Sequence, residues 1–331
     1  LTRIIIMTLM IALGVAITAG LSVVNPELTS SFDQHFQQTY LPDVIVKKTT
    51  QMGFESEDLE RAKSISGLTD VYEVLEYDMG RTRVYYFDFS KYPEKAFYQL
   101  QGRLPENGLE VLVEGASLSL KNHQLEDTLI VQGQTVTIVG IINQPLYHYR
   151  KEIPNQQQTE TLDTIIYFDR SLIQVPLITD LYFRFDHHEH LFTNRYAVKI
   201  EQKVSELKTI LGEEDFVYLT HEQMITPVII QSYADKMIVI QLIFPIFFTL
   251  VILIVVSTTM RRLIEDERLL IGAYLSIGYQ NSSLRLRYYI VALIAGFLGI
   301  LLGVVFGYHA LAQLIYNAFG ELLMMPRRVV N

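Results

Sequence analysis

Three histidines and two carboxylates occupy five consecutive positions, Asp186-His187-His188-Glu189-His190. Imidazole and carboxylate groups both bind zinc, so this run is a candidate metal site. However, neighbouring side chains in one turn rarely converge on a single ion without a further ligand from elsewhere in the chain. We therefore favour a solvated acidic loop here, and we expect no metal or other cofactor.

A second metal motif is incomplete. His221-Glu222 begins the zinc pattern H-E-x-x-H, but position 225 is isoleucine where the second histidine is required. The chain also has no cysteine, which excludes Cys-ligated metals, iron–sulfur clusters and disulfides.

Motifs for nucleotide hydrolysis and acyl transfer are missing. The phosphate-binding loop G-x-x-x-x-G-K-[ST] needs a Gly-Lys pair, and this dipeptide does not occur in the chain. The nucleophile motif G-x-S-x-G is absent as well. The chain is therefore predicted not to be an enzyme, and any ATP hydrolysis that drives it must come from a partner.

Three long runs of the sequence contain no charged side chain. Residues 4–24, 237–260 and 288–312 contain no Asp, Glu, Lys or Arg, and the mean hydropathy of the chain is +0.22. A helix rises about 1.5 Å per residue, so each run can cross a hydrocarbon core of about 30 Å. The sequence therefore predicts an integral membrane α-helical protein with three transmembrane helices.

Charge predicts the orientation of these helices. The loop 261–287 carries five arginines and Arg3 adds a sixth basic residue, against three on the opposite side near the spans: Lys236, Arg327 and Arg328. Basic residues favour the cytoplasmic side, so we expect a multi-pass plasma-membrane protein with a cytoplasmic N-terminus. Residues 25–236 are then extracytoplasmic, and their 32 acidic and 19 basic side chains argue against nucleic-acid binding.

The predicted organisation follows from these runs. Because the first run is too long for a signal peptide, we expect an uncleaved first helix. The segments are transmembrane helix 1 (1–24), an extracytoplasmic α+β domain (25–236), transmembrane helix 2 (237–260), a cytoplasmic loop with a coupling helix (261–287), transmembrane helix 3 (288–312) and an extracytoplasmic tail (313–331). The non-Met start and the odd number of helices predict a fragment, with a fourth helix missing.

The large domain mixes strand and helix patterns. Runs rich in β-branched and aromatic residues predict strands at 43–47, 71–77, 84–89, 164–168 and 181–185, and a hairpin over 128–143. Helical periodicity predicts helices at 55–66 and 194–211, a helical stalk over 28–38, and a helix that enters the second span from 221–236.

Small and polar residues in the spans indicate helix packing. The third run contains Gly296, Gly299, Gly303 and Gly307, and the last three form a G-x-x-x-G-x-x-x-G row. Glycine lets a second helix approach closely, so we expect a packing face. Gln241 could bond to a neighbouring helix or line a route, and His309 is explained by an interfacial position.

The cytoplasmic loop has an amphipathic pattern. Apolar residues recur at near-helical spacing over 261–278, while Glu265, Asp266, Glu267 and Arg268 crowd the polar side. We expect a helix that lies along the membrane surface and ends at Gly278. It is either a connector resting on lipid or a docking helix for a soluble partner.

This loop carries a family resemblance. The spacing Arg268-x-x-Ile271-Gly272, followed by Gly278, resembles the signature of FtsX/MacB-type ABC transporter permeases (the FtsX-like permease family). The order of span, outer domain, span, loop and glycine-rich span is also similar. Residues 102–110, 139–147 and 162–167 resemble outer-domain segments of long permeases of this family. The chain departs from the family pattern at two places. It has Tyr274-Leu275-Ser276 where the family often has Leu-Lys-Ala, and Glu126-Asp127 where the family often has Gly-Asp.

The resemblance implies a permease subunit, or the N-terminal half of a longer permease, of the mechanotransmission type. The implied partners are a cytoplasmic ABC ATPase dimer, a second permease half or protomer, and the lipid bilayer. The implied ATPase-coupling residues are Arg262, Glu265, Arg268, Ile271, Gly272, Ile277 and Gly278. The implied cargo is a peptide, lipid or lipoprotein.

Two other functions are alternatives to a permease. A membrane receptor or regulator could relay a signal to a cell-wall enzyme or sensor partner, but a loop of 27 residues is too short for an output domain. A membrane-anchored enzyme would need a nucleophile or metal constellation, and the motifs above supply none.

Overall fold

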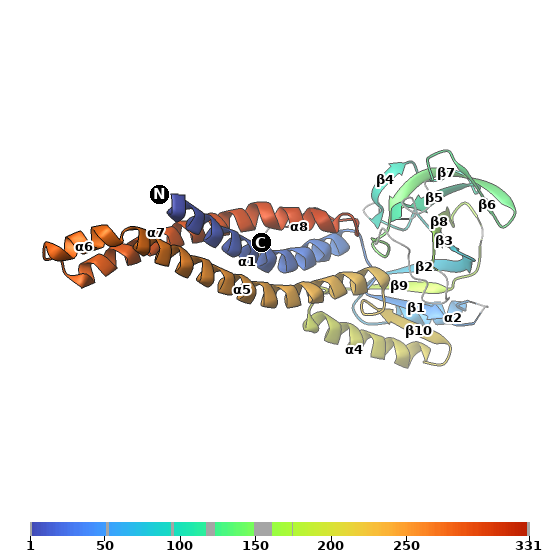
Figure 1. Cartoon of the computed structure of the whole chain (residues 1–331). Coiled ribbons are helices and arrows are strands. Elements are labelled where there is room, and N and C mark those ends of the chain that lie inside the picture. Colours follow the sequence, from blue (N-terminus) through green and yellow to red (C-terminus); the bar gives the residue numbers. More distant parts are fainter. Residues whose placement is uncertain are drawn as a thin grey trace. The chain divides into compact units, whose positions relative to one another are not determined.

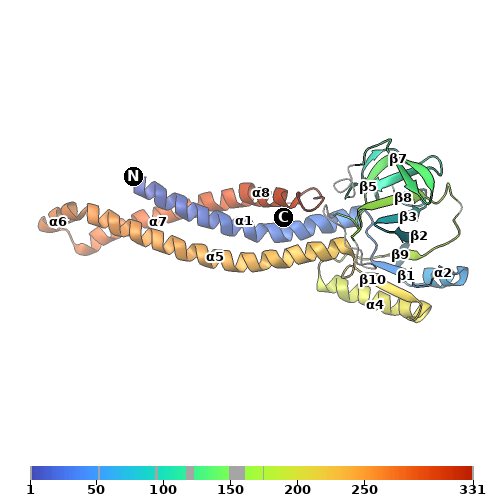
Figure 2. The same cartoon turned by 45° about the vertical axis from the view of Figure 1, so that its right-hand side comes forward.

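The computed structural model describes residues 2–50, 53–93, 96–116, 123–148, 161–173 and 175–329. The chain divides into two compact units, which are described separately. The helical unit contains residues 1–28, 233–318 and 330–331, and the sheet unit contains residues 29–232 and 319–329. Figures 1 and 2 show the elements of both units.

Three long helical segments build the helical unit and continue into the sheet unit. They are α1 (Thr2–Gln38), α5 (Ile225–Asp266), and the run formed by α7 (Asn281–Phe306), the π-helical turn η2 (Gly307–Leu311) and α8 (Ala312–Phe319). Each is long and apolar enough to cross a membrane. The short helix α6 (Arg268–Ser276) connects α5 and α7. The prediction of three membrane helices with a domain between the first two is therefore confirmed.

Most apolar side chains of these helices face outwards. The most apolar stretch of α5 has no buried residue, and Leu242 is 68% exposed. Among the described residues, a small core joins Met7 and Ile11 of α1 to Ala295 of α7. Exposed apolar surface of this extent suits a hydrocarbon environment, where it carries no hydration cost.

The helices are longer than the uncharged runs. The predicted stalk over 28–38 is confirmed, since α1 runs to Gln38, and the helix expected to enter the second span begins at Ile225. The third helical segment starts at Asn281 and ends at Phe319. The boundaries of the membrane-crossing parts stay predictions, as does the sidedness of the segments.

The sheet unit contains ten strands in its described part. They are β1 (Val44–Lys48), β2 (Leu68–Met79), β3 (Thr82–Phe87), β4 (Tyr98–Gly102), β5 (Glu110–Glu114), β6 (Thr128–Val131), β7 (Gln134–Asn143), β8 (Thr164–Asp169), β9 (Asp180–Phe185) and β10 (Phe216–Thr220). Their order is β10-β1-β9-β2-β3-β8-β5-β7-β4, and β6 pairs with β7. The pairs β3–β8 and β5–β7 are parallel, and the others are antiparallel.

Apolar and aromatic side chains fill this sheet. Val84, Val111 and Ile138 lie at the centre of one core cluster, and Tyr85 stacks on Tyr167 with ring centroids 5.4 Å apart. Two helices accompany the sheet, α2 (Ser56–Lys63) and α4 (Asn194–Leu211). Both lie within the helices predicted at 55–66 and 194–211, and a capping box at Glu55 and Asp58 starts α2.

The structure confirms the predicted strands and the hairpin over 128–143 as β6–β7. The strands at 71–77, 164–168 and 181–185 lie within β2, β8 and β9, whereas those at 43–47 and 84–89 overlap β1 and β3 but include Asp43, Asp88 and Phe89, which lie outside the observed strands. Strands β4, β5 and β10 were not predicted.

Candidate coupling site

The candidate site is the segment Arg262–Gly278, and its first half differs from the prediction. One helix was expected over 261–278, but α5 continues to Asp266 and a separate helix, α6, begins at Arg268. Arg262 and Glu265 therefore lie on the last turns of α5. The two helices remain linked by backbone bonds, since the Glu267 N–H donates to the Leu263 carbonyl at 3.2 Å and the Glu267 carbonyl accepts from the Ile271 N–H at 2.9 Å.

Side chains from α7 contact the residue between α5 and α6. The Tyr288 hydroxyl donates to a carboxylate oxygen of Glu267 at 2.6 Å, and the Arg287 guanidinium lies 3.9 Å from the same oxygen. These contacts hold Glu267 against α7. Glu267 is also the residue at which the helix is interrupted.

Gly278 ends the segment as predicted. α6 stops at Ser276, and Gly278 has φ +99°, a backbone conformation that favours glycine because it has no Cβ. The Gly278 N–H donates to the Leu275 carbonyl at 3.1 Å, which closes the last turn.

The surface of α6 is open. None of its residues is buried, Leu269 is 91% exposed, and the following Ile277 is 76% exposed. A Cβ atom at Gly272 would have no described neighbour within 4 Å. Arg268 is exposed and Ile271 is partly buried. The segment thus presents apolar side chains, one cation and a bare backbone patch without using them to pack its own unit.

The start of α1 lies beside this segment within the helical unit. The Arg3 guanidinium donates to the Arg262 carbonyl at 3.1 Å and forms an ion pair with Asp266. Arg3 and the loop 261–287 therefore lie at the same end of the helical unit. This placement agrees with the sequence argument that assigned both to one side of the membrane.

Three of the four glycines in the third helical segment lie against α1. A Cβ atom would lie 2.8 Å from the Ile11 Cβ at Gly299 and 2.6 Å from the Ala12 carbonyl oxygen at Gly303, and Gly307 contacts the Ala16 backbone. At Gly296 a Cβ atom would meet nothing within 4 Å among the described residues. The close approach therefore uses the G-x-x-x-G-x-x-x-G row and not Gly296.

Two glycines of α1, which the sequence did not indicate, also lie close to other helices, Gly14 to α5 and Gly20 to η2. A Cβ atom would lie 2.5 Å from the Ile252 Cδ1 at Gly14 and 3.0 Å from the Gly307 carbonyl oxygen at Gly20. Their six-residue separation does not match the four-residue row that signals a packing face. The Gln241 side chain also donates to the Leu21 carbonyl, so this residue bonds to a neighbouring helix.

The histidine-rich run disperses into separate interactions. His187 lies 2.9 Å from Asp43, His190 lies 2.5 Å from Asp33, and Glu189 pairs with Lys199 at 3.1 Å. The bond to Asp43 raises the pKa of His187. Within the described ranges, no group of three or more His, Cys, Asp or Glu side chains could hold a metal ion.

A buried histidine pair in the sheet unit was not anticipated. The Nε2 atoms of His35 and His148 lie 3.0 Å apart, and His148 Nδ1 lies 2.8 Å from the Met324 carbonyl oxygen. Burial lowers the pKa of His35 to about 3 and that of His148 to about 4. No sequence signal could have paired them, because they lie far apart in the chain and outside any motif.

The C-terminal part of the chain matches a known protein family. Residues 242–326 match the family described as FtsX-like permease C-terminal. The crystal structure of the extracellular domain of the noncanonic ABC-type transporter YknZ from Gram-positive bacteria is 9% identical, with a TM-score of 0.31. That match covers 54% of this chain and 99% of that chain. No curated protein matches the chain. The match to the family confirms the resemblance to FtsX-like permeases, over a segment that contains most of α5 and all of α6 and α7.

Proposed function

We propose that the chain is the permease subunit of an ATP-driven ABC transporter of the mechanotransmission type. The observation that carries this proposal is α6: an exposed helix with no buried residue, inside the segment that matches the FtsX-like family. A partner ATPase dimer would dock on this surface and supply the nucleotide chemistry.

The contacts around α6 support transmission of force within the helical unit. Glu267 is held by Tyr288 of α7, and Arg3 of α1 pairs with Asp266 of α5. A pull on α6 would therefore act on three helices at once. The glycine row stabilises α7 against α1 through close van der Waals contact, which favours rigid-body movement over independent sliding.

The sheet unit is the proposed receiver of this movement. Helices α1 and α5 contribute residues to both units, so both are covalently continuous with it. We place residues 25–236 outside the cytoplasm and the loop 261–287 inside it. A peptide, a lipid or a lipoprotein is the proposed cargo, and a second permease half or protomer would complete the complex.

The test uses Gly272 and measures ATPase activity. The detergent-solubilised chain should co-purify with its ATPase and raise the hydrolysis rate of that ATPase. Gly272→Trp places a bulky side chain on the bare patch of α6 and should lower this stimulation about fivefold or more, a loss of about 1 kcal/mol in coupling.

Gly272→Ala is the matched control. A methyl group has no described neighbour within 4 Å, and alanine favours a helix over glycine by about 0.5–1 kcal/mol. Stimulation should therefore survive in this variant. Unchanged stimulation in Gly272→Trp, with normal insertion into the membrane, would dismiss α6 as the coupling element.

A further inference from the structure

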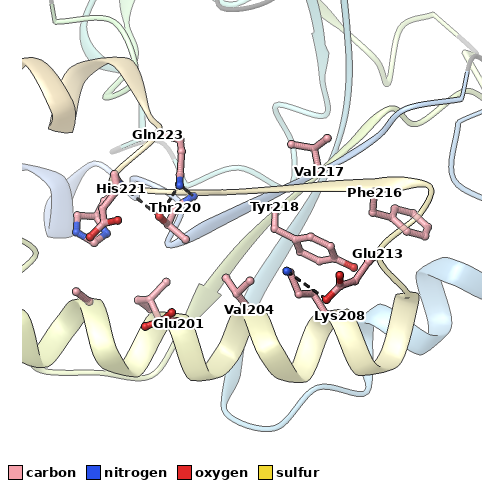
Figure 3. Close-up of a pocket in the computed structure, with 13 residues that line it drawn as sticks. Glu201, Val204, Lys208, Glu213, Phe216, Val217, Tyr218, Thr220, His221 and Gln223 are labelled. Carbon is pink, nitrogen blue, oxygen red and sulfur yellow. Dashed lines mark hydrogen bonds and ion pairs between the residues drawn. The ribbon is translucent and has the colours of Figure 1, made fainter.

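A groove lies between strand β10 and helix α4 in the sheet unit. It has a volume of about 490 Å³, and α4 runs beside the strand (Figure 3). Its apolar lining includes Ala197 and Val204 of α4 and Phe216 and Tyr218 of β10. Among the described strands, β10 pairs with β1 alone, so its other edge is open to a further strand.

The backbone of β10 indicates which groups face this open edge. The Thr49 N–H donates to the Asp215 carbonyl at 2.9 Å, and the register continues with Lys47 opposite Val217. Backbone groups alternate in direction along an antiparallel strand. Val217 therefore bonds towards β1, whereas the N–H and carbonyl groups of Phe216 and Tyr218 point away from it. No other described segment bonds to these backbone groups.

The open edge ends at Thr220, because a side chain already occupies the backbone N–H of this residue. The Thr220 N–H donates to the Gln223 Oε1 atom at 2.8 Å. Two residues, Phe216 and Tyr218, thus remain available for a short added strand. Edge strands with available backbone groups bind extended peptides by this strand addition.

The charges of the groove select the kind of peptide. Three carboxylates line it, from Glu201, Glu213 and Glu222, against one cation, Lys208. Lys208 is paired with Glu213 at 3.3 Å. Within the described residues, neither Glu201 nor Glu222 forms an ion pair. Burial lowers the pKa of the neighbouring His221, so this ring is neutral at pH 7.

We propose that this groove binds an extended, basic segment of a protein partner, which adds to β10 as a further strand. Alternate side chains of the added strand point towards α4, as those of Phe216 and Tyr218 do. Lysine or arginine at these positions packs its aliphatic stem over Val204 and places its charge near Glu201 and Glu222. The inference goes beyond ATPase coupling and needs no nucleotide.

The test measures peptide binding to the full chain in neutral detergent micelles at low salt. The probe is the fluorescein-labelled hexapeptide Lys-Val-Lys-Val-Lys-Val, followed by fluorescence anisotropy. Saturable binding is expected. The double variant Glu201→Gln/Glu222→Gln should bind about fivefold more weakly. The control Glu60→Gln removes an exposed carboxylate on α2 and should bind like the unmodified chain.

A second arm separates strand addition from charge attraction. The same hexapeptide with N-methyl groups on alternate residues keeps its charges and side chains but loses the N–H donors of one edge. It should bind about tenfold more weakly, and hydrogen exchange at residues 216–218 should slow only with the unmethylated peptide. Equal binding of the two peptides, or binding unaffected by the double variant, would overturn the proposal. Both readouts are independent of ATPase stimulation.

Discussion

His148 has one consistent hydrogen-bonding arrangement. The Met324 carbonyl can only accept, so His148 Nδ1 carries the hydrogen that is donated to it. The Nε2 atom of His148 is then unprotonated, and its lone pair accepts a hydrogen bond from the Nε2–H group of His35. Protonation of His148 at Nε2 would place two N–H groups against each other in a buried site. The geometry and the lowered pKa values therefore agree that both rings are neutral.

This pair predicts a loss of stability in acid. Burial lowers the pKa of His148 to about 4 in the folded protein, whereas an exposed histidine in the unfolded chain has a pKa of 6.5. The unfolded chain therefore takes up the proton first as the pH falls. The stabilisation is fully present above about pH 6.5 and decreases towards pH 4, by about 3 kcal/mol for this group. The free energy of opening of the segment around His148, obtained from hydrogen-exchange rates after correction for the intrinsic exchange rate at each pH, should fall over this range.

The variant His148→Asn should flatten this pH dependence, because asparagine does not titrate. It should also destabilise the segment at pH 7 by about 1–3 kcal/mol, since buried polar groups lose partners. The matched control His188→Asn changes an exposed histidine of the 186–190 run. The control should keep the pH dependence of the unmodified chain. If its pH dependence were as flat as that of His148→Asn, groups other than His148 would be responsible for the acid sensitivity.

Residue-level polar contacts were the least predictable part of the protein from its sequence. Lys47 lies 2.7 Å from Glu76 and 3.2 Å from Asp180, and Arg83 lies 2.7 Å from Asp78. These charges are nearly buried and attract one another across strands, with Lys47 joining β1 to β2 and β9, and Arg83 joining β3 to the adjacent β2. A local pattern of hydrophobic and polar positions contains no information about such partners, so it predicted the strands but not the network.

At the scale of elements, two glycines of the third helical segment, Gly303 within the row and Gly296 outside it, lead to opposite predictions. Gly303→Leu must displace α1, because even a Cβ atom would lie 2.6 Å from the Ala12 carbonyl oxygen. We expect a destabilisation of about 1–3 kcal/mol, as in other overpacked sites. It should appear as a lower aggregation temperature of the chain in detergent.

Gly296→Leu provides the comparison on the same helix. A Cβ atom at this position meets no described residue within 4 Å, so the larger side chain should leave the aggregation temperature unchanged or raise it slightly. Equal losses in both variants would mean that glycine flexibility, and not close packing, decides the behaviour of this helix.

The elements themselves were mostly predictable. Long apolar runs specify membrane helices by length alone, and 18-residue α4 has enough turns for its period to be evident. The division of 261–278 into two helices was not predictable. Tyr288 and Arg287 of another helix contact Glu267, the residue at the division, and local helix periodicity carries no signal of such tertiary contacts.

At the scale of the whole molecule, sidedness is the prediction on which the proposed function depends. The chain has no cysteine, so single cysteines can be introduced without removing others. Ser205→Cys on α4 should react with a membrane-impermeant maleimide in intact cells. Ser276→Cys at the end of α6 should react only after the membrane is opened. Both positions are exposed, so accessibility within the fold does not bias the comparison.

The reverse labelling pattern would place α6 outside the cytoplasm, where no ATPase could reach it. Arginine counts predicted this sidedness from the sequence, and the proximity of Arg3 to Arg262 supports a shared side for the two segments. The order of strands in the sheet could not be predicted from the sequence, because pairing between distant strands depends on the complete set of strands and not on any one of them.

Strand β1 has consequences for how the protein is made. It is the first strand of the chain, yet its two neighbours are β9 and β10, with Val44 opposite both Phe183 and Thr220. Newly synthesised β1 lacks both of these partners until β9 and β10 have been made, close to the end of the sheet unit's sequence. Completion of this part of the sheet is therefore a late step of folding, because pairing between distant segments is slow.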